Sequence, residues 1–520
     1  MSNRRRYTLL DAIDDPQLFA PWFKDKASWQ AWFVFLRALF ALPLSPEQLA
    51  IYQQLTGRAE APTSVATEGW LICGRRSGKS FILALCAVYL ACFHQYRQHL
   101  APGERGVVLV VASDRKQARV IFRYVRALLL GVPMLRRLVE RETAEAFDLN
   151  NGTSIEIMAA SYRSLRGYTV IAALLDELAF WPTDDSANPD TEIIAAIKPA
   201  MATIPNAMLL CASSPYAKRG ALFDSFKRHH GKDGDPILIW KAPTRVMNST
   251  VPQSVIDAAM ESDPASAAAE YLAQFRTDVE TFVGRDVVEA AVVQGRHELP
   301  RMDHTRYHAF VDPSGGSSDS MTLAIAHVQG KTVIVDAVRE RRAPFSPDGV
   351  VEEFAATLKA YGIGQVVGDR YGSEWPRERF RVHGVEYRVA DKIKSDLYLA
   401  LLPLLNSSRV ELLDHPRLVN QLIGLERRTS RAGKDSIDHQ PGAHDDVCNA
   451  VAGAAVLAAE AAAQPRAPFV SPTFYSKQAG FFGGGAENAT NKSATAKFYE
   501  YYGGLGGVGS PWPGSGVKDW

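Results

Sequence analysis

Short apolar runs separated by polar loops mark the first half of the chain, at residues 70–73, 107–112, 170–175, 207–212 and 237–240. Such uninterrupted runs are typical of strands that are buried on both faces of a parallel sheet. The apolar stretch 81–93 is long enough for a helix. Residues 147–159 carry Asn-Asn-Gly at their centre, which favours a hairpin turn. The pattern therefore predicts an α/β domain with a mostly parallel central sheet.

A second pattern of strands and helices begins near residue 307. Its expected order is strand, strand, strand, helix, strand, further mixed elements, and a final Ala-rich helix at 447–463. The Ala-rich stretch between the two patterns is predicted to be a helical linker or lid. Residues 464–520 are rich in Gly, Ser, Pro and aromatic residues without periodicity, which indicates a flexible tail. The expected domains are a helical region at 1–60, the first α/β domain at 61–242, the linker at 243–300, the second α/β domain at 301–463, and the tail at 464–520.

Length and composition narrow the class of protein. A chain of 520 residues is too long for one core. The formal net charge is +1, so any nucleic acid partner must be held by local patches of positive charge. The five cysteines are scattered without metal-type spacing, which indicates reduced thiols in a cytoplasm. No apolar run is long enough for a bilayer and no signal peptide is evident, so no membrane partner is expected.

The sequence Cys-Gly-Arg-Arg-Ser-Gly-Lys-Ser at 73–80 lies between a predicted strand and a predicted helix. Strand, glycine-containing loop and helix together form the usual phosphate-binding loop of ATPases. Lys79 is expected to reach the β- and γ-phosphates of ATP, and Ser80 to hold Mg²⁺. The remaining loop residues that we expect around the nucleotide are Arg75, Arg76, Ser77 and Gly78. Cys73 stands where the motif usually has its first glycine.

Other candidate residues for the same nucleotide follow from their places in the pattern. The strand 170–175 runs into Asp176 and Glu177 at the edge where α/β sheets bind ligands. Asp176 is expected to hold Mg²⁺, and Glu177 to orient and deprotonate the attacking water. Gln48 either reads the adenine edge or is an ordinary surface residue. Ser213, Ser214 and Pro215 either sense the γ-phosphate or are an ordinary exit from their strand.

In the second pattern, acids stand where elements end or begin. Asp312 and Asp369 each follow a predicted strand, and His444-Asp445-Asp446 opens the final helix. Carboxylates at such places can hold two Mg²⁺ or Mn²⁺ ions for phosphodiester cleavage. The sequence leaves open whether Asp445 or Asp446 is the ligand, and whether His444 is a ligand, supports one, or is an ordinary neutral histidine at a helix start. Basic clusters at 339–342, 377–388 and 427–434 would suit a polyanionic substrate, or be solvated charged faces.

Taken in order, these motifs resemble the large terminase subunit of tailed bacteriophages. The resemblance covers residues 45–459 and includes Ser-Leu-Arg-Gly before Leu-Leu-Asp-Glu, then Ser-Ser-Pro, Val-Asp-Pro, Gly-Asp-Arg and His-Asp-Asp. It implies a P-loop ATPase domain followed by an RNase H-like nuclease domain. It also implies that Gln48 belongs to the adenine motif, that 213–215 couple hydrolysis to movement, and that Asp446 is favoured over Asp445. Arg166 matches an arginine thought to act on a neighbour's ATP, with Arg75 and Arg76 as rivals.

The same resemblance implies a biological setting. The expected partners are double-stranded DNA, a portal protein, a small terminase subunit, and further copies of the chain in a ring on an empty procapsid. The expected location is the bacterial host cytoplasm and, transiently, the procapsid. Two alternatives are a helicase or repair-type translocase with a fused nuclease, and an inactive prophage protein that only docks on a portal. Packaging strategy, ring size, host and cleavage preference are left open.

Overall fold

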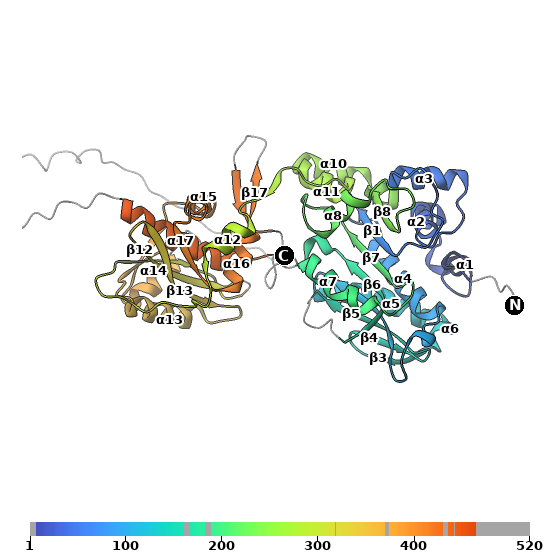
Figure 1. Cartoon of the computed structure of the whole chain (residues 1–520), viewed down its shortest axis with the longest axis horizontal. Coiled ribbons are helices and arrows are strands. Elements are labelled where there is room, and N and C mark those ends of the chain that lie inside the picture. The colour runs from blue at the N-terminus through green and yellow to red at the C-terminus, as the bar shows by residue number, and fades with distance from the viewer. Residues whose placement is uncertain are drawn as a thin grey trace, which may run out of the picture. The chain divides into compact units, whose positions relative to one another are not determined.

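A computed structural model describes residues 7–160, 167–181, 189–317, 319–369, 374–429, 435–440 and 443–463 (Figure 1). These residues form two α/β domains, each built on its own large sheet with its own hydrophobic cores. The expected tail at 464–520 and the segment containing Arg166 lie outside the described residues.

The first domain is organised around an eight-stranded sheet in the order β3-β4-β5-β2-β6-β7-β1-β8. Every neighbouring pair from β5 to β8 is parallel, whereas β3 and β4 are joined in antiparallel pairs. The central parallel strands β2, β6 and β7 are almost completely buried, as their apolar runs predict. The carboxyl ends of β1, β6 and β7 therefore meet at one edge. The strands are β1 (Glu68–Cys73), β2 (Gly106–Ala112), β3 (Val139–Glu142), β4 (Ala146–Leu149), β5 (Thr153–Ala159), β6 (Thr169–Asp176), β7 (Met208–Ser213) and β8 (Ile237–Ala242).

Helices cover both faces of this sheet, and each face has a separate core. One core includes residues of α1, α2, α4 and α5, and the other includes residues of α7 and α8. Ser45 caps α3 with Pro46 as its first residue, as expected from the sequence. The helices are α1 (Leu9–Asp14), α2 (Gln30–Leu39), α3 (Pro46–Thr56), α4 (Lys79–Phe93), α5 (Arg115–Gly131), α6 (Pro133–Arg136), α7 (Pro189–Met201), α8 (Gly220–His229), α9 (Thr244–Met247), α10 (Gln253–Ser262) and α11 (Pro264–Leu272).

The second domain has a seven-stranded sheet in the order β10-β16-β13-β12-β11-β14-β15. Strands β11, β12 and β13 form an antiparallel meander, and β14 then pairs parallel to β11, which is the RNase H-like arrangement. A small sheet of order β18-β17-β9 accompanies it. The strands are β9 (Val279–Thr281), β10 (Val292–Val293), β11 (Tyr307–Asp312), β12 (Met321–Gln329), β13 (Thr332–Arg341), β14 (Gln365–Gly368), β15 (Glu386–Val389), β16 (Val410–Leu413), β17 (Glu426–Thr429) and β18 (Asp435–Asp438).

Helices also cover both faces of the second sheet. Residues before 301 already belong here, because β10 pairs with β16 and α12 contributes to the same core as α17. The helices are α12 (Arg285–Ala291), α13 (Pro347–Ala360), α14 (Glu374–Val382), α15 (Lys394–Asn406), α16 (Pro416–Ile423) and α17 (Asp446–Ala463).

Helix α17 is the central helix of the second domain. By length and composition it would qualify as a membrane span, but most of its residues are buried in the domain core. It crosses β11 so closely that a Cβ atom on Gly453 would lie 2.2 Å from the Phe310 ring. This close approach brings the first turn of α17 to the end of β11, where Asp312 stands.

Candidate functional site

The loop between β1 and α4 is the segment in which the sequence predicts a phosphate-binding loop. Arg76 and Gly78 both have positive φ angles, of 64° and 101°, and Gly78 directly precedes the first residue of α4. Gly74 lies so close to α9 that a Cβ atom there would be 2.2 Å from Thr244 Oγ1. Cys73 is the last residue of β1 and is fully buried, so its side chain belongs to the core. A cysteine therefore fits where the motif usually has glycine.

Lys79, the first residue of α4, is buried against this loop. Its Nζ donates to the carbonyl oxygens of Cys73 and Gly74, at 2.9 and 3.2 Å, and to Ser214 Oγ at 3.2 Å. It also lies 3.3 Å from Glu177 Oε1. A buried ammonium group at the N-terminus of a helix is suited to an anion such as a phosphate.

Asp176, Ser80 and Gln117 form a second cluster beside the loop. Ser80 Oγ donates to Asp176 Oδ2 at 2.9 Å, and Gln117 Nε2 donates to the same oxygen at 2.8 Å and to Ser80 Oγ at 3.1 Å. Asp176 is fully buried, and its Oδ1 has no hydrogen-bond partner among the described residues. Burial, and then the charge of Glu177, raises the pKa of Asp176 to about 6. A buried carboxylate with one open oxygen beside a hydroxyl is a suitable ligand set for Mg²⁺.

Glu177 connects the loop to the end of β7. Its φ of 51° places it in the left-handed region. Glu177 Oε2 accepts from Ser213 Oγ at 3.3 Å and from the Ser214 backbone N–H at 3.2 Å. Ser213, Ser214 and the following Pro215 are all buried. These two bonds link Glu177 to the end of β7, which is where the resemblance places a coupling segment.

The other residues predicted to contact the nucleotide have different partners or lie outside the described residues. Arg75 pairs with Glu270 of α11 at 3.1 Å, with most of its side chain exposed. Arg76 is exposed, and its carbonyl accepts from Asn248. The side-chain oxygen of Gln48 accepts from the Ser45 N–H in the capping box of α3. Arg166 is not among the described residues, so the structure leaves the choice of arginine open.

The second domain gathers carboxylates at a cavity of about 430 Å³. Asp312 ends β11 and Asp369 directly follows the neighbouring parallel strand β14, so both lie at one edge of the sheet. Asp446 begins α17, whose first turn is tied to β12 by a bond from Thr322 Oγ1 to the Asp446 carbonyl oxygen. The cavity is also lined by Asp319, Lys394, His439, His444, Asp445 and Asn449.

Two of these carboxyl groups have strongly perturbed protonation. Burial, together with the nearby charges of Asp446 and Asp369, raises the pKa of Asp312 well above its ordinary value, although Asn449 donates to it at 2.7 Å. Burial, and then the charge of Asp445, raises the pKa of Asp446 to about 6. Asp446 Oδ2 is buried and accepts no hydrogen bond among the described residues. Mutual repulsion and an unpartnered oxygen are what a divalent cation would relieve.

Asp445 differs from Asp446 in its partners. Its Oδ2 accepts from Tyr398 at 2.9 Å and lies 3.0 Å from Lys394 Nζ. Its charge is thus compensated by the protein itself, whereas that of Asp446 is not. This contrast favours Asp446 as the open ligand. His444 Nδ1 lies 4.0 Å from Asp446 Oδ2 and 3.8 Å from Asp319 Oδ1, which leaves its role open.

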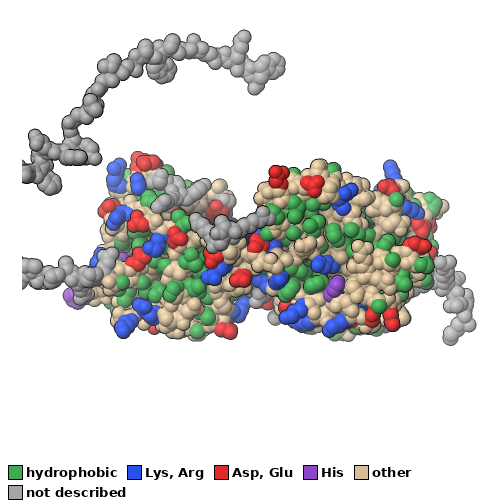
Figure 2. Space-filling model, turned by 90° about the horizontal axis from the view of Figure 1, so that it is seen from above, with side chains coloured by type: hydrophobic (Ala, Val, Ile, Leu, Met, Phe, Trp, Pro, Cys, Tyr) green, Lys and Arg blue, Asp and Glu red, His purple; other side chains and the backbone are tan. Residues whose placement is uncertain are grey.

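Many arginines of the three basic clusters are paired with acids. Side chains of mixed sign also alternate over the face of the molecule in Figure 2. Pairing of this kind leaves less free positive charge near the cavity than the sequence suggests. Residues 430–434 of the third cluster lie outside the described residues. The pairs are Arg339 with Glu298, Arg341 with Glu353, Arg342 with Glu340, Arg379 with Asp348, Arg427 with Asp435, and Arg428 with Glu426.

Sequence reasoning missed Gln117 and Asn449. Gln117 lies in the first turn of α5, where the Asp114 cap accepts from its N–H and turns its amide toward Asp176. Asn449 lies on α17, almost fully buried, and orients Asp312. A polar residue inside an apolar helix is the one signal that could have singled out Asn449.

Comparison with solved structures finds large terminases of bacteriophages. The HK97 large terminase is 17% identical, with a TM-score of 0.34, over 82% of this chain and 99% of that chain. The large terminase of a thermophilic bacteriophage, in complex with ATP-γ-S, is 12% identical, with a TM-score of 0.33, over 82% of this chain and 98% of that chain. The large terminase nuclease of the thermophilic phage G20c with bound magnesium is 16% identical, with a TM-score of 0.29, over 32% of this chain and 93% of that chain.

No family model matches the chain, and no curated protein matches it. At such identities and TM-scores, function has to be argued from the side chains of the two sites.

Proposed function

We propose that this chain is a terminase-type motor subunit, which hydrolyses ATP to move double-stranded DNA into a procapsid and cuts concatemeric DNA with a metal-dependent nuclease. One observation carries the proposal: buried Lys79 lies 3.3 Å from Glu177, and Asp176 bonded to Ser80 stands beside them. A phosphate ligand, a metal ligand set and a base are thus assembled at one sheet edge. A second domain supplies a separate cavity lined by carboxylates.

For ATP hydrolysis, the loop N–H groups and Lys79 bind the phosphates, and Lys79 compensates charge on the γ-phosphate. Ser80 and Asp176 would hold Mg²⁺, which supplies charge neutralisation between the phosphates. Gln117 keeps these two ligands together through its bonds to both. Glu177 accepts the proton of the attacking water. Its bonds to Ser213 and Ser214 transmit a change at the γ-phosphate to β7, the role that we propose for 213–215.

For DNA cleavage, Asp312, Asp369 and Asp446 would hold two Mg²⁺ or Mn²⁺ ions, which activate water and stabilise the leaving oxygen of a phosphodiester. Each acid stands at the end or beginning of a strand or helix, so the backbone fixes its position. Asn449 orients the Asp312 carboxylate for this task.

The biological setting belongs to the same proposal. The order of the motifs supports a ring of subunits on a portal, a small terminase subunit as partner, and action in the bacterial cytoplasm and transiently on the procapsid. Within that ring, Arg166 would reach the ATP of a neighbour, with Arg75 and Arg76 as rivals. Gln48 would approach the adenine once the hydrogen bond from the Ser45 N–H to its side chain is broken.

The test is a pair of single substitutions in the two domains. Lys79→Ala is expected to lower ATP turnover by roughly 10²-fold or more, because a preorganised charge at the transferred phosphate is lost, and to leave plasmid cleavage in Mn²⁺ intact. Asp369→Asn is expected to lose plasmid cleavage in Mn²⁺ and to keep wild-type ATP turnover. Lys198→Ala serves as the control, since Lys198 is half exposed in a pair with Glu68. Wild-type ATP turnover by Lys79→Ala, or wild-type cleavage by Asp369→Asn, contradicts the corresponding half of the proposal.

A further inference from the structure

Helix α5 exposes a face that carries only positive charge. Residues 115–138 include seven lysines and arginines and not one aspartate or glutamate, although the whole chain has a net charge of only +1. Five of the seven are exposed residues of α5, namely Arg115, Lys116, Arg119, Arg123 and Arg126. Such a local concentration of one sign of charge is what a nearly neutral protein needs in order to hold a polyanion.

The helical period gathers these five side chains on one side of α5. At about 100° per residue, their positions fall within an arc of about 100° around the helix axis. Between Arg115 and Arg126 the helix rises by about 16 Å, a length over which a DNA duplex carries about ten phosphates. Packing of the opposite, apolar side on the domain core directs the basic side outward. The buried residues of that apolar side are Ala118, Ile121, Val125, Leu128 and Leu129.

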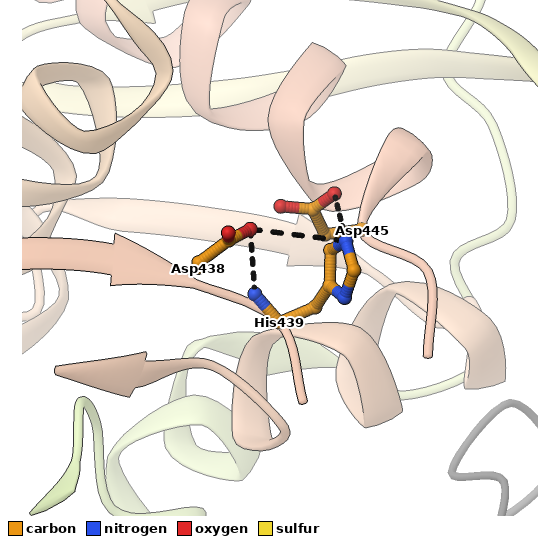
Figure 3. Close-up of side chains that lie close together, drawn as sticks. All are labelled: Asp438, His439 and Asp445. Atoms are coloured by element: carbon orange, nitrogen blue, oxygen red, sulfur yellow. Dashed lines mark hydrogen bonds and ion pairs between the residues drawn. The ribbon is translucent and has the colours of Figure 1, made fainter. Parts of the chain in front are cut away.

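Most of the positive charge on this face is uncompensated. Arg126 Nε lies 2.8 Å from Glu142 Oε1, whereas the other four side chains form no ion pair with described residues. The cavity of the second domain differs in this respect. There Lys394 Nζ lies 2.7 Å from Asp438 Oδ1 and 3.0 Å from Asp445 Oδ2, the two carboxylates labelled in Figure 3. The charge of Lys394 is thus compensated by the protein, whereas the basic face of α5 is open to an external anion.

The same helix begins at the proposed nucleotide site. Gln117, in its first turn, donates to Asp176 Oδ2 at 2.8 Å and to Ser80 Oγ at 3.1 Å. The Asp114 carboxylate caps the helix by accepting from the N–H groups of Lys116 and Gln117. An anion held on α5 is therefore joined through one side chain to the residues expected to hold Mg²⁺.

We propose that this basic face of α5 binds the phosphate backbone of double-stranded DNA. The choice of DNA as the anion rests on the proposed function, whereas the basic face itself is a feature of the described residues. Four of the five cations are arginines, whose planar guanidinium groups suit phosphate oxygens. Phosphate contacts are independent of base sequence, as a protein that moves along DNA requires.

The experiment measures binding of the full-length protein to a short, fluorescently labelled DNA duplex by anisotropy, in EDTA and without nucleotide. Arg119→Ala/Arg123→Ala is expected to weaken binding by about tenfold or more at low salt. The slope of log affinity against log salt concentration should become shallower by about two, because two phosphate contacts are lost. Arg119→Lys/Arg123→Lys keeps both charges and should retain most of the affinity.

Lys227→Ala/Arg228→Ala is the matched control, since it removes two exposed cations from α8 of the same domain and should leave binding unchanged. Thermal unfolding checks that each variant is folded. Wild-type DNA affinity of Arg119→Ala/Arg123→Ala would overturn the proposal. An equal loss of affinity in the control would also overturn it, because net charge alone would then hold the DNA.

ATP turnover without DNA separates this inference from the proposed function. Arg119→Ala/Arg123→Ala should keep the wild-type turnover, since neither arginine belongs to the nucleotide site described above. Normal turnover with unchanged DNA affinity of this variant would leave the proposed function standing without this surface. A DNA affinity that depends on Arg119 and Arg123, in a wild-type protein that neither hydrolyses ATP nor cuts DNA, would support the surface and contradict the proposed function.

Discussion

Individual carboxyl groups in the two sites differ in how far neighbouring residues compensate their charge. Glu177 has a lysine at 3.3 Å and two donors at the end of β7. Asp176 and Asp446 each have a buried oxygen without a hydrogen-bond partner among the described residues. The first kind of carboxylate is held in position by its donors, and the second kind has an oxygen open to a cation. Two predictions follow from this difference.

Glu177→Gln is expected to bind ATP with nearly unchanged affinity and to hydrolyse it at least about 10²-fold more slowly. The amide keeps the size of the side chain and can still accept from Ser213 and Ser214, but it cannot take a proton from water. Binding is measured with a fluorescent ATP analogue, and hydrolysis by phosphate release. Loss of binding would instead assign Glu177 to holding the nucleotide.

Asp446→Asn is expected to stabilise the metal-free protein at pH 8. The pKa of Asp446 is raised from 3.8 to about 6, so the folded state keeps a proton that the unfolded chain releases at lower pH. The free energy of unfolding therefore falls as the pH rises from about 4 to about 6. An asparagine at this position avoids that decrease, which is at most about 3 kcal/mol. Thermal unfolding at pH 8 should show the gain, which should disappear below pH 4.

Asp445→Asn is the matched control for that prediction. It breaks the ion pair with Lys394, so it should lower stability by about 1 kcal/mol or more at pH 8. Plasmid cleavage in Mn²⁺ should suffer more from Asp446→Asn than from Asp445→Asn. The opposite order of cleavage would exchange the roles of the two neighbours.

Secondary structure elements bring residues distant in sequence to the phosphate-binding loop. Helix α2 supplies Trp32, whose indole N–H donates to the Ser77 carbonyl at 2.8 Å in a fully buried position. Helices α9 and α11 contact the same loop through Thr244 and the backbone of Glu270. The N-terminal helices and the expected linker therefore both support the loop of the proposed nucleotide site.

Trp32→Phe is expected to destabilise the first domain by about 1–3 kcal/mol, because the Ser77 carbonyl is left buried without its donor, and to raise the KM for ATP. Urea unfolding and steady-state ATP turnover measure the two effects. Trp29→Phe is the control, since its half-buried ring packs on Phe23 and Phe81. Equal effects of both substitutions would mean that ring packing, and not the hydrogen bond, supports the loop.

The elements that the sequence predicts well are those with a strong local signal. The apolar runs match β1, β2, β6, β7 and β8 within two residues at each end, and Asn-Asn-Gly at 150–152 joins β4 to β5. Contacts between distant segments have no such signal. The bond from Gln117 to Asp176, the Lys394 pair with Asp445 and the arginine pairs all depend on tertiary packing. Asp312, Asp369, Asp445 and Asp446 could be named from the sequence, but Asp319 could not, nor could the way in which each acid is compensated.

At the scale of the whole molecule, the proposed motor depends on contacts between copies of the chain. Arg166→Ala is expected to lower ATP turnover by about 10³-fold or more if it acts on a neighbour's ATP. Mixing Arg166→Ala with Glu177→Gln protein should then restore part of the activity, because one copy supplies the arginine and the other an intact site. The measurement is ATP turnover under conditions that favour rings.

Two results would decide against this role of Arg166. Full activity of Arg166→Ala alone would transfer the role to Arg75 or Arg76. An inactive mixture, with each variant folded and assembled, would mean that the arginine acts within its own subunit.

The position of α17 in the second domain has a consequence for synthesis. This helix supplies Asp446 and Asn449 and fills the core against β11, yet it is the last described helix of the chain. A ribosome releases the phosphate-binding loop long before it releases α17. We expect a nascent chain stalled near residue 440 to bind ATP but not to cut a plasmid. Translation order alone would then keep a newly made subunit harmless to the DNA around it until α17 has been made.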